Sequence, residues 1–419
     1  MKNFATKKSL SSSAPIVNLR GLISLILISC YVFPLLAKSP GKKIESIPFE
    51  MVGSYVVVKL KVNESTPLNI ILDSGISNTI ITELEPTDKI SLNFSDVKNL
   101  MGLGGGDHLE AYKSNYNVLK VGKLKLESKT VFVLREDIFN LSKHTGTKIN
   151  GLIGVDFFSD YIVEVNYTNK RVNFYENESL TVPKGYETIQ LNTEYNKIFV
   201  NLMVTDSDST KRKVKMLLDT GAELNAWFQT HKSESVHIPK INVRCTIGEG
   251  FNGEIKGLVG RMQQICFGSF CLTHPIVSFP DSASIAAIVE NSDRDGTIGS
   301  QLLSRFNYFI DYNKKQFHFK PNENFKDKYK YNIAGIEVTQ IIPAVPQSEI
   351  WKVWENSPAA AAGLKVGDQI VEIDGQKAYQ FTVNELKMFF ETPSKRLLEV
   401  MVIRDGKEVR VKIDMNSKI

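Results

Sequence analysis

The chain has 419 residues, 42% of them apolar, and a formal net charge of +5. This length and apolar content are enough for two or three domains with their own hydrophobic cores. Residues 1–37 contain four Lys or Arg and no acidic residue, so the remainder carries a charge of only about +1. This excludes the basic field on which nucleic-acid binding depends, and we expect no nucleic acid partner.

The first 37 residues have the pattern of a targeting segment. Basic residues precede an apolar stretch of about 16 residues from Leu22 to Ala37, which is short for a membrane span and typical of a signal peptide. Three interpretations remain open: a signal peptide cleaved after Ala37, a lipoprotein signal with Cys30 as the lipidated residue, and a retained anchor. Each predicts export to the periplasm or cell envelope, with membrane contact only through this signal or a lipid on Cys30.

Two apolar runs, residues 55–62 and 68–72, are separated by a short polar turn and lead into Asp73-Ser74-Gly75. They predict two strands, the second of which ends at the aspartate. The glycine permits a sharp turn at this point, so the carboxylate would emerge at the head of a sheet.

The same arrangement recurs 146 positions later, where apolar runs lead into Asp219-Thr220-Gly221. Other landmarks recur in the same order and at nearly the same spacing. This repetition predicts a duplicated domain. We expect a first lobe at residues 45–180 and a second lobe at residues 185–320.

Each lobe also carries an apolar-Gly pair. Ile153-Gly154 begins 80 positions after Asp73, and Ile298-Gly299 begins 79 positions after Asp219. A glycine in such a place lets two backbones approach closely. We expect these pairs to pack beside the aspartate turns in a structural role.

Glycine-rich stretches occupy matched positions of the two lobes. They contain Gly102, Gly104, Gly105 and Gly106 in the first lobe, and Gly248 and Gly250 in the second. Neither stretch has the strand-to-helix context or the Lys-Ser/Thr pair of a phosphate-binding loop. Both therefore predict the tips of hairpins.

Cysteine usage leaves two interpretations open. Cys266 and Cys271 flank a Phe-Gly-Ser-Phe hairpin turn, and a disulfide across that turn would fit an exported protein. The other interpretation is that these residues and Cys245 are small buried side chains. No pair of cysteines has the spacing of a zinc site.

The last segment, residues 333–416, has a different pattern of helix caps and turn residues. Ser357-Pro358 predicts the start of a short helix, with Ser357 as its cap, and Gly363 predicts its end. A strand that stops at an Asp-Gly turn, a longer helix at residues 384–391 and two final strands are expected to follow.

With Asp-Ser/Thr-Gly and a downstream apolar-apolar-Gly in each half, residues 45–320 resemble the retropepsin-like and pepsin-like aspartic peptidases. The pattern Ser-Pro-Ala…Gly-Leu…Gly-Asp at residues 357–368 resembles a bacterial PDZ domain over residues 333–416. The implied fold class is mainly β: two duplicated aspartic-peptidase-type β lobes in one chain, followed by a small α+β PDZ domain.

The resemblance implies that Asp73 and Asp219 face each other as a catalytic dyad. Two carboxyls about 3 Å apart cannot both ionise easily, so they share a proton and activate one water. Ser74, Gly75, Thr220 and Gly221 would support the dyad. No metal or cofactor is implied, and the chain has no His-Glu-x-x-His motif. Peptide or protein substrates are the expected partners.

The resemblance also implies that the two glycine-rich hairpins are flaps that close over the substrate; the alternative is a pair of exposed turns. Ile76 and Ala222 follow the triplets, where many pepsin-like enzymes have a hydroxyl that hydrogen-bonds the carboxylate. Losing such donors raises a carboxyl's pKa. We therefore expect a pH optimum less acidic than that of pepsin.

In the PDZ segment, Ala334-Gly335-Ile336 lies where that family binds a peptide carboxylate. PDZ domains bind peptides by adding a strand to a sheet edge. A C-terminal peptide is therefore an expected ligand, and the domain would either recruit substrates or restrain activity. The competing hypothesis for the whole chain is a catalytically silent, peptide-binding scaffold protein.

Overall fold

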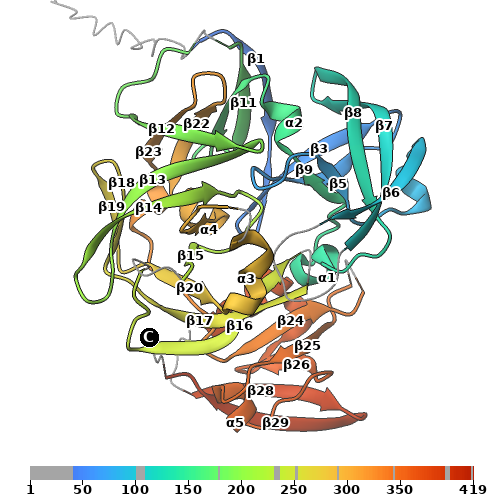
Figure 1. Cartoon of the computed structure of the whole chain (residues 1–419). Helices are drawn as coiled ribbons and strands as arrows, with labels where there is room; N and C mark the ends of the chain where they lie inside the picture. The colour runs from blue at the N-terminus through green and yellow to red at the C-terminus, as the bar shows by residue number, and fades with distance from the viewer. Residues whose placement is uncertain are drawn as a thin grey trace, which may run out of the picture. The chain divides into compact units, whose positions relative to one another are not determined.

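The computed structural model is mainly β, with 51% strand and 12% helix (Figure 1). It describes residues 41–100, 109–177, 180–230, 236–250, 253–289, 292–342, 345–391, 397–416 and 419. The expected signal segment with Cys30, and the first-lobe glycines Gly102, Gly104, Gly105 and Gly106, lie outside these residues. No helix in the described part of the chain has the length and hydropathy needed to cross a membrane.

The first lobe contains an eight-stranded sheet in the order β2-β3-β4-β9-β5-β8-β7-β6. Its strands are β2 (Glu50–Val52), β3 (Tyr55–Val62), β4 (Leu68–Leu72), β5 (Thr79–Ile81), β6 (Phe94–Leu100), β7 (Leu109–Val121), β8 (Leu124–Leu134) and β9 (Gly151–Ile153). The predicted strands at 55–62 and 68–72 are confirmed with the same bounds. β4 runs parallel to β9, with Leu72 opposite Ile153, so Asp73 and Gly154 leave the sheet at the same edge.

The second lobe repeats these pairings. Its strands are β13 (Lys197–Thr205), β14 (Lys211–Leu218), β15 (Ala226–Phe228), β16 (Asn242–Gly250), β17 (Gly253–Arg261), β18 (Gln264–Phe267), β19 (Phe270–Thr273), β20 (Ile276–Pro280) and β21 (Gly296–Ile298). β14 runs parallel to β21, with Leu218 opposite Ile298, as β4 does to β9. β13 and β14 lie side by side in Figure 1, in the second lobe's counterpart of the β3–β4 hairpin.

The closing strands of the two lobes pair with one another. These strands are β1 (Lys43–Pro48), β10 (Ile162–Asn166), β11 (Arg171–Tyr175), β12 (Glu187–Glu194), β22 (Phe306–Asp311) and β23 (Gln316–Pro321). β10 is antiparallel to β22, with Val163 opposite Ile310. A single apolar cluster extends through both lobes. This shared sheet and core fix the two aspartate-bearing edges relative to each other, because packed interiors deform little.

The helices of the lobes are short. They are α1 (Leu141–Thr145), α2 (Val155–Phe158), α3 (Ser282–Val289) and α4 (Ser300–Leu303), with a 3₁₀ turn at Pro86–Asp88 and another at Glu323–Lys326. A disulfide joins Cys266 and Cys271 across the β18–β19 hairpin, which decides the alternative that the sequence left open. Cys245 is a buried free thiol.

The PDZ segment has its own sheet, in the order β24-β25-β26-β28-β29, and its own apolar core. Its elements are β24 (Ile336–Gln340), β25 (Ser348–Val353), α5 (Pro358–Ala361), β26 (Gln369–Ile373), β27 (Gln376–Lys377), a 3₁₀ turn (Ala378–Gln380), α6 (Val383–Glu391), β28 (Leu397–Arg404) and β29 (Lys407–Asp414). The predicted cap is confirmed, since the Ser357 hydroxyl accepts the Ala360 N–H at 3.1 Å. Gly363 follows α5 in the left-handed region, with φ +83°.

Candidate active site

Each aspartate is held by the strand across from its own. The Asp73 N–H donates to the Ile153 carbonyl at 3.0 Å, and the Asp219 N–H donates to the Ile298 carbonyl at 3.0 Å. Each carboxyl group therefore projects from the end of a parallel strand pair. The two apolar-Gly motifs supply these acceptors, so their place beside the aspartates is part of the site's framework.

Ser74 and Thr220 join the two aspartate turns through four hydrogen bonds. The Ser74 N–H donates to the Thr220 Oγ1 at 3.0 Å, and the Thr220 N–H donates to the Ser74 Oγ at 3.1 Å. Their hydroxyls in turn donate to the carbonyls of Leu218 and Leu72, at 2.8 and 2.6 Å. Both side chains are buried, so this reciprocal network fixes the distance between the two carboxyls.

The triplet glycines give each aspartate the room that it needs. The Gly75 N–H donates to the Asp73 Oδ1 at 2.7 Å, and the Gly221 N–H donates to the Asp219 Oδ1 at 3.0 Å. A Cβ atom on Gly75 would lie 2.6 Å from the Asp219 carboxyl, and one on Gly221 would overlap the Asp73 carboxyl. Each glycine is therefore required by the aspartate of the opposite lobe.

Gly154 and Gly299 are also confined by backbone. A Cβ atom on Gly154 would lie 2.7 Å from the backbone of Ser77 and Asn78, while one on Gly299 would overlap the carbonyl of Leu224. In both lobes the glycine allows the loop after the aspartate triplet to lie against the apolar-Gly turn. Asp156, just beyond Gly154, is half-buried and accepts a hydrogen bond from the Asn78 Nδ2 at 3.5 Å; desolvation raises its pKa to about 6.

The two carboxyls lie close together and differ in their surroundings. Burial, followed by repulsion from Asp219, raises the pKa of Asp73 well above its usual range. Burial also raises the pKa of Asp219, but the nearby cations Arg294 and Lys197 oppose that rise. Asp73 is 5% exposed, whereas Asp219 is more open to the cavity. Burial therefore disfavours ionisation of the pair, while Arg294 and Lys197 favour the charged form of Asp219.

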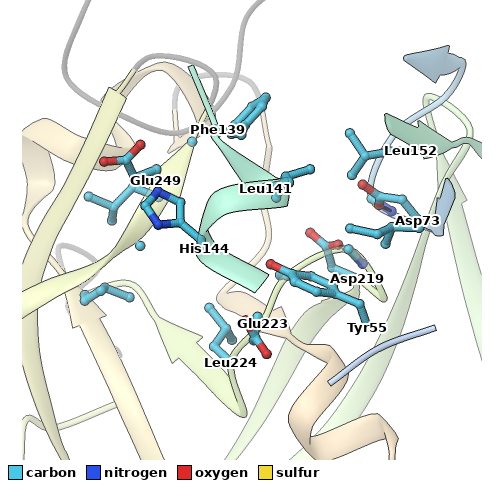
Figure 2. A pocket seen from close by; sticks show the side chains of 18 of the residues that line it. Tyr55, Asp73, Phe139, Leu141, His144, Leu152, Asp219, Glu223, Leu224 and Glu249 are labelled. Atoms are coloured by element: carbon cyan, nitrogen blue, oxygen red, sulfur yellow. Dashed lines mark hydrogen bonds between the residues drawn. The ribbon is translucent and has the colours of Figure 1, made fainter. Parts of the chain in front are cut away.

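The dyad lies in a cavity of about 600 Å³. Figure 2 shows Tyr55 beside the two aspartates, with α1 carrying Leu141 and His144 across the same space. Glu223, four residues after Asp219, accepts the Ser54 N–H of the first lobe at 2.9 Å. A cavity of this size is appropriate for a peptide segment or a drug-sized ligand.

The predicted hairpin of the second lobe is present. β16 and β17 pair down to Gly250 opposite Gly253, and both Gly248 and Gly250 line the cavity. The backbone at Gly248 has open space around it, with no heavy atom within 4 Å of an added Cβ. The hairpin therefore borders the same cavity as the two aspartates, and its action as a flap stays a prediction.

In the PDZ loop at residues 334–336, the backbone N–H groups of Ala334 and Gly335 already donate hydrogen bonds within the domain. The Ala334 N–H donates to the Phe390 carbonyl at 3.3 Å, and the Gly335 N–H donates to the Asn332 Oδ1 at 2.9 Å. Gly335 has φ +73° and Ala334 is fully buried. In this conformation, a peptide carboxylate would have to displace those bonds to use the two N–H groups.

The cavity residues that the sequence patterns did not single out include Tyr55, Lys197 and Arg294. Tyr55 and Lys197 each begin the strand that precedes an aspartate strand, and Arg294 lies two residues before β21. The internal repeat could have found the first two, since Val57 pairs with Ile71 as Phe199 pairs with Leu217. That these side chains line the cavity beside the aspartates, however, follows only from the folded lobes.

A cluster of Asp206, Asp208 and His237 brings possible metal ligands together in the second lobe. Its atoms already have protein partners. The Arg212 Nε donates to the Asp206 Oδ2 at 2.9 Å, and the His237 Nδ1 lies 2.6 Å from the Asp208 Oδ2. We therefore interpret the cluster as an ion-pair network at the turn between β13 and β14.

The fold and the site define a mainly β protein with the aspartate turns of an aspartyl protease. Residues 58–157 match the family model for aspartyl proteases, and residues 319–415 match the model for PDZ domains. The chain therefore contains an aspartyl protease domain followed by a PDZ domain. No curated protein matches the chain. Asp73 and Gly154 lie within the first match, while Asp219 lies outside both.

Proposed function

We propose that the chain is an exported aspartic endopeptidase whose dyad is Asp73 and Asp219. The observation that carries this proposal is the close approach of two carboxyls from different lobes, one buried and one half-buried, in environments of unequal charge. One carboxyl is favoured as an acid and the other as a base, which is the division of labour that hydrolysis of a peptide bond requires.

In this mechanism a water molecule lies between the carboxyls and the scissile carbonyl. Asp219 takes a proton from the water while the oxygen attacks the carbonyl carbon. Asp73 donates its proton to the carbonyl oxygen, which gives a neutral tetrahedral diol. Asp219 then protonates the leaving nitrogen, and Asp73 recovers a proton from one diol hydroxyl as the C–N bond breaks. Each residue finishes in its starting protonation state.

The test is hydrolysis of a quenched-fluorescent peptide library by residues 38–419 between pH 3 and pH 8, with and without pepstatin. We expect cleavage that pepstatin blocks and that Asp219→Asn abolishes. Cleavage that resists pepstatin but needs Asp219 would retain the dyad with an unusual cleft. Absence of cleavage at every pH, with peptides still bound, would replace this proposal with the silent peptide-binding scaffold.

We propose that the PDZ domain restrains the protease domain until a peptide binds. α1 of the first lobe packs against β24 and α6, and β24 is a sheet edge of the kind to which PDZ domains add a peptide strand. The Lys387 Nζ donates to the His144 carbonyl at 2.9 Å, and the His144 ring lies 4.5 Å from that of Trp351. A peptide on β24 would compete with α1, which also lines the cavity.

This role can be tested with Lys387→Met, which removes the bond to α1. We expect a higher basal rate of hydrolysis and a smaller activation by added C-terminal peptides. Lys412→Met is the matched control. Lys412 is exposed on β29, and its ion pair with Glu399 is long, with 3.9 Å between Nζ and Oε2. Equal basal rates in the wild type and Lys387→Met would favour substrate recruitment instead.

Export rests on the N-terminal targeting pattern and is supported by the Cys266–Cys271 disulfide, since such bonds persist in oxidising compartments. Fractionation of cells that express the full chain, with and without Cys30→Ala, separates simple export from lipid anchoring. A cytoplasmic protein in both cases would contradict export.

A further inference from the structure

The second-lobe side of the cavity holds a buried arginine without a counterion of its own. Arg294 lines the cavity and is 4% exposed. Its guanidinium lies over the Trp227 ring, 5.1 Å from the ring centroid, and its Nε is buried without a hydrogen-bond partner. Among the described residues, no carboxylate lies within ion-pair distance of it. Its positive charge interacts with the carboxyl of Asp219, which opposes the lowering of the Arg294 pKa by burial.

Lys197 is a second cation on the same side. It is partly buried, lines the cavity and interacts electrostatically with Arg294, Asp219 and Asp73. Within the described part of the chain, it also forms no ion pair. Two cations that repel each other in one partly buried space are costly unless an anion joins them.

The first lobe has the same backbone and different side chains. The Asn150 N–H donates to the Asn69 carbonyl at 2.8 Å, as the Asp295 N–H donates to the Lys215 carbonyl at 2.7 Å. Arg294 therefore occupies the position that the fully buried Ile149 has in the first lobe. By the strand pairing described above, Lys197 likewise replaces Tyr55.

The neighbouring positions extend the contrast. In the first lobe Ile80 pairs with Leu152, and in the second lobe Trp227 pairs with Thr297. The hydroxyl of Thr297 is buried without a partner. At these matched positions the first lobe therefore carries no charged side chain, whereas the second lobe presents positive charge on an aromatic surface.

The four glutamates of the cavity do not cancel this charge. Glu223 accepts the Ser54 N–H, and Glu337 accepts the Trp354 Nε1–H at 2.9 Å. Burial raises the pKa of Glu249, Glu337 and Glu391, which disfavours their charged forms. None of the four forms an ion pair with Lys197 or Arg294.

We propose that Arg294 and Lys197 form a carboxylate-binding subsite beside Asp219, so that the enzyme prefers substrates with a carboxylate next to the scissile bond on the second-lobe side. The inference rests on the proposed peptidase function. A planar guanidinium with free donors fits a carboxylate well, and Trp227 would pack against the methylene groups of the substrate. The first-lobe wall would take an apolar residue on the other side of the bond.

The carboxylate has two chemical sources: the side chain of an internal Glu or Asp, or the C-terminus of a short product-side peptide. The competing explanation is that the cations serve only to keep Asp219 ionised. That explanation predicts equal losses for every substrate, because the dyad is common to all of them. A ratio between matched substrates therefore separates the two explanations.

The experiment compares kcat/KM for paired peptides that differ by Glu against Gln at each of the four positions around the cleaved bond. We expect the wild type to prefer Glu by about tenfold to a hundredfold at one position on one side. In Arg294→Gln this ratio should fall to about 1, and in Lys197→Met it should fall severalfold. Arg261→Gln, in the second lobe but outside the cavity lining, is the control and should keep the ratio.

The two sources are separated by measuring each peptide with a free and with an amidated C-terminus. A preference that survives amidation belongs to a side chain, and one that disappears belongs to the C-terminal carboxylate. A wild-type ratio near 1 in both forms, or an unchanged ratio in Arg294→Gln, overturns the subsite.

Binding of the same pairs to Asp73→Asn, measured by calorimetry, makes the result independent of hydrolysis. A preference for Glu in binding, without cleavage of any peptide by the wild type, would keep the subsite and refute the peptidase. Cleavage without any preference, in either kinetics or binding, would keep the peptidase and refute the subsite.

Discussion

Asp73 and Asp219 occupy equivalent positions in two lobes with the same strand pairings, yet their environments differ. Asp73 is buried, and burial and the charge of Asp219 raise its pKa, whereas Asp219 is half-buried and the cations Arg294 and Lys197 oppose the rise in its pKa. The difference teaches that the motif places a carboxyl, while the residues around the motif assign its protonation state. At the positions where the second lobe has Arg294 and Lys197, the first lobe has the uncharged residues Ile149 and Tyr55.

The largest expected effect tests whether the two aspartates act together. Asp73→Asn and Asp219→Asn should each lower kcat by at least about a thousandfold. When two residues act together in catalysis, replacing either one removes nearly all of the activity. Steady-state hydrolysis of the best library peptide measures this loss, and circular dichroism checks the fold. Wild-type-like activity in either variant would break the dyad mechanism.

The next effect tests the crossed packing of the glycines. Gly221→Ala and Gly75→Ala should each lower kcat/KM by about a hundredfold, because a displacement of about 1 Å near the chemistry has that cost. The added methyl would displace the aspartate of the opposite lobe. Gly248→Ala is the control, since its added Cβ meets open space, and it should lose far less activity.

The hydrogen bonds between the two turns should matter for stability in both lobes alike. Ser74→Ala or Thr220→Ala leaves buried N–H and carbonyl groups without partners, so each should lower the free energy of unfolding by about 1–3 kcal/mol. Urea denaturation of both variants measures the loss. A large loss in one variant and none in the other would contradict this expectation, because the two halves of the network would then contribute unequally to stability.

The pH dependence of kcat/KM should distinguish the effect of Arg294 from that of Lys197. Removing Arg294 takes away a charge that lowers the pKa of Asp219, so the acidic limb of the kcat/KM profile should move to higher pH in Arg294→Gln. Lys197 lowers the pKa of both aspartates, so Lys197→Met should move both limbs upward. Profiles that do not shift would contradict the assignment of Asp219 as the ionised partner.

The smallest effect is on thermal stability. The pKa of Asp73 is raised in the folded state, so its contribution to stability is full below the unfolded pKa and is lost as pH rises through the folded pKa. Asn cannot ionise, and Asp73→Asn should therefore melt at a higher temperature than the wild type at pH 7, with the gain vanishing near pH 3. A gain that persists at pH 3 would point to a cause other than ionisation.

Much of the framework was accessible from the sequence because it depends on short-range signals. The strands before each aspartate, the cap at Ser357 and the Asp374-Gly375 turn after β26 follow from apolar periodicity and backbone preferences. The paired triplets and their downstream glycines also placed the two aspartates. The disulfide stayed open because spacing alone does not distinguish a bonded pair from two buried thiols.

By itself, the sequence determined the repeated strand–Asp-Ser/Thr-Gly units, the order of the domains and the presence of a PDZ segment, since these are local patterns. Only the tertiary structure decided which glycine lies against which carboxyl, that β10 and β22 join the lobes, and that Arg294 stands where Ile149 stands in the first lobe. Those features depend on residues far apart in the chain, and a carboxyl's charge state is set by the groups that folding brings around it.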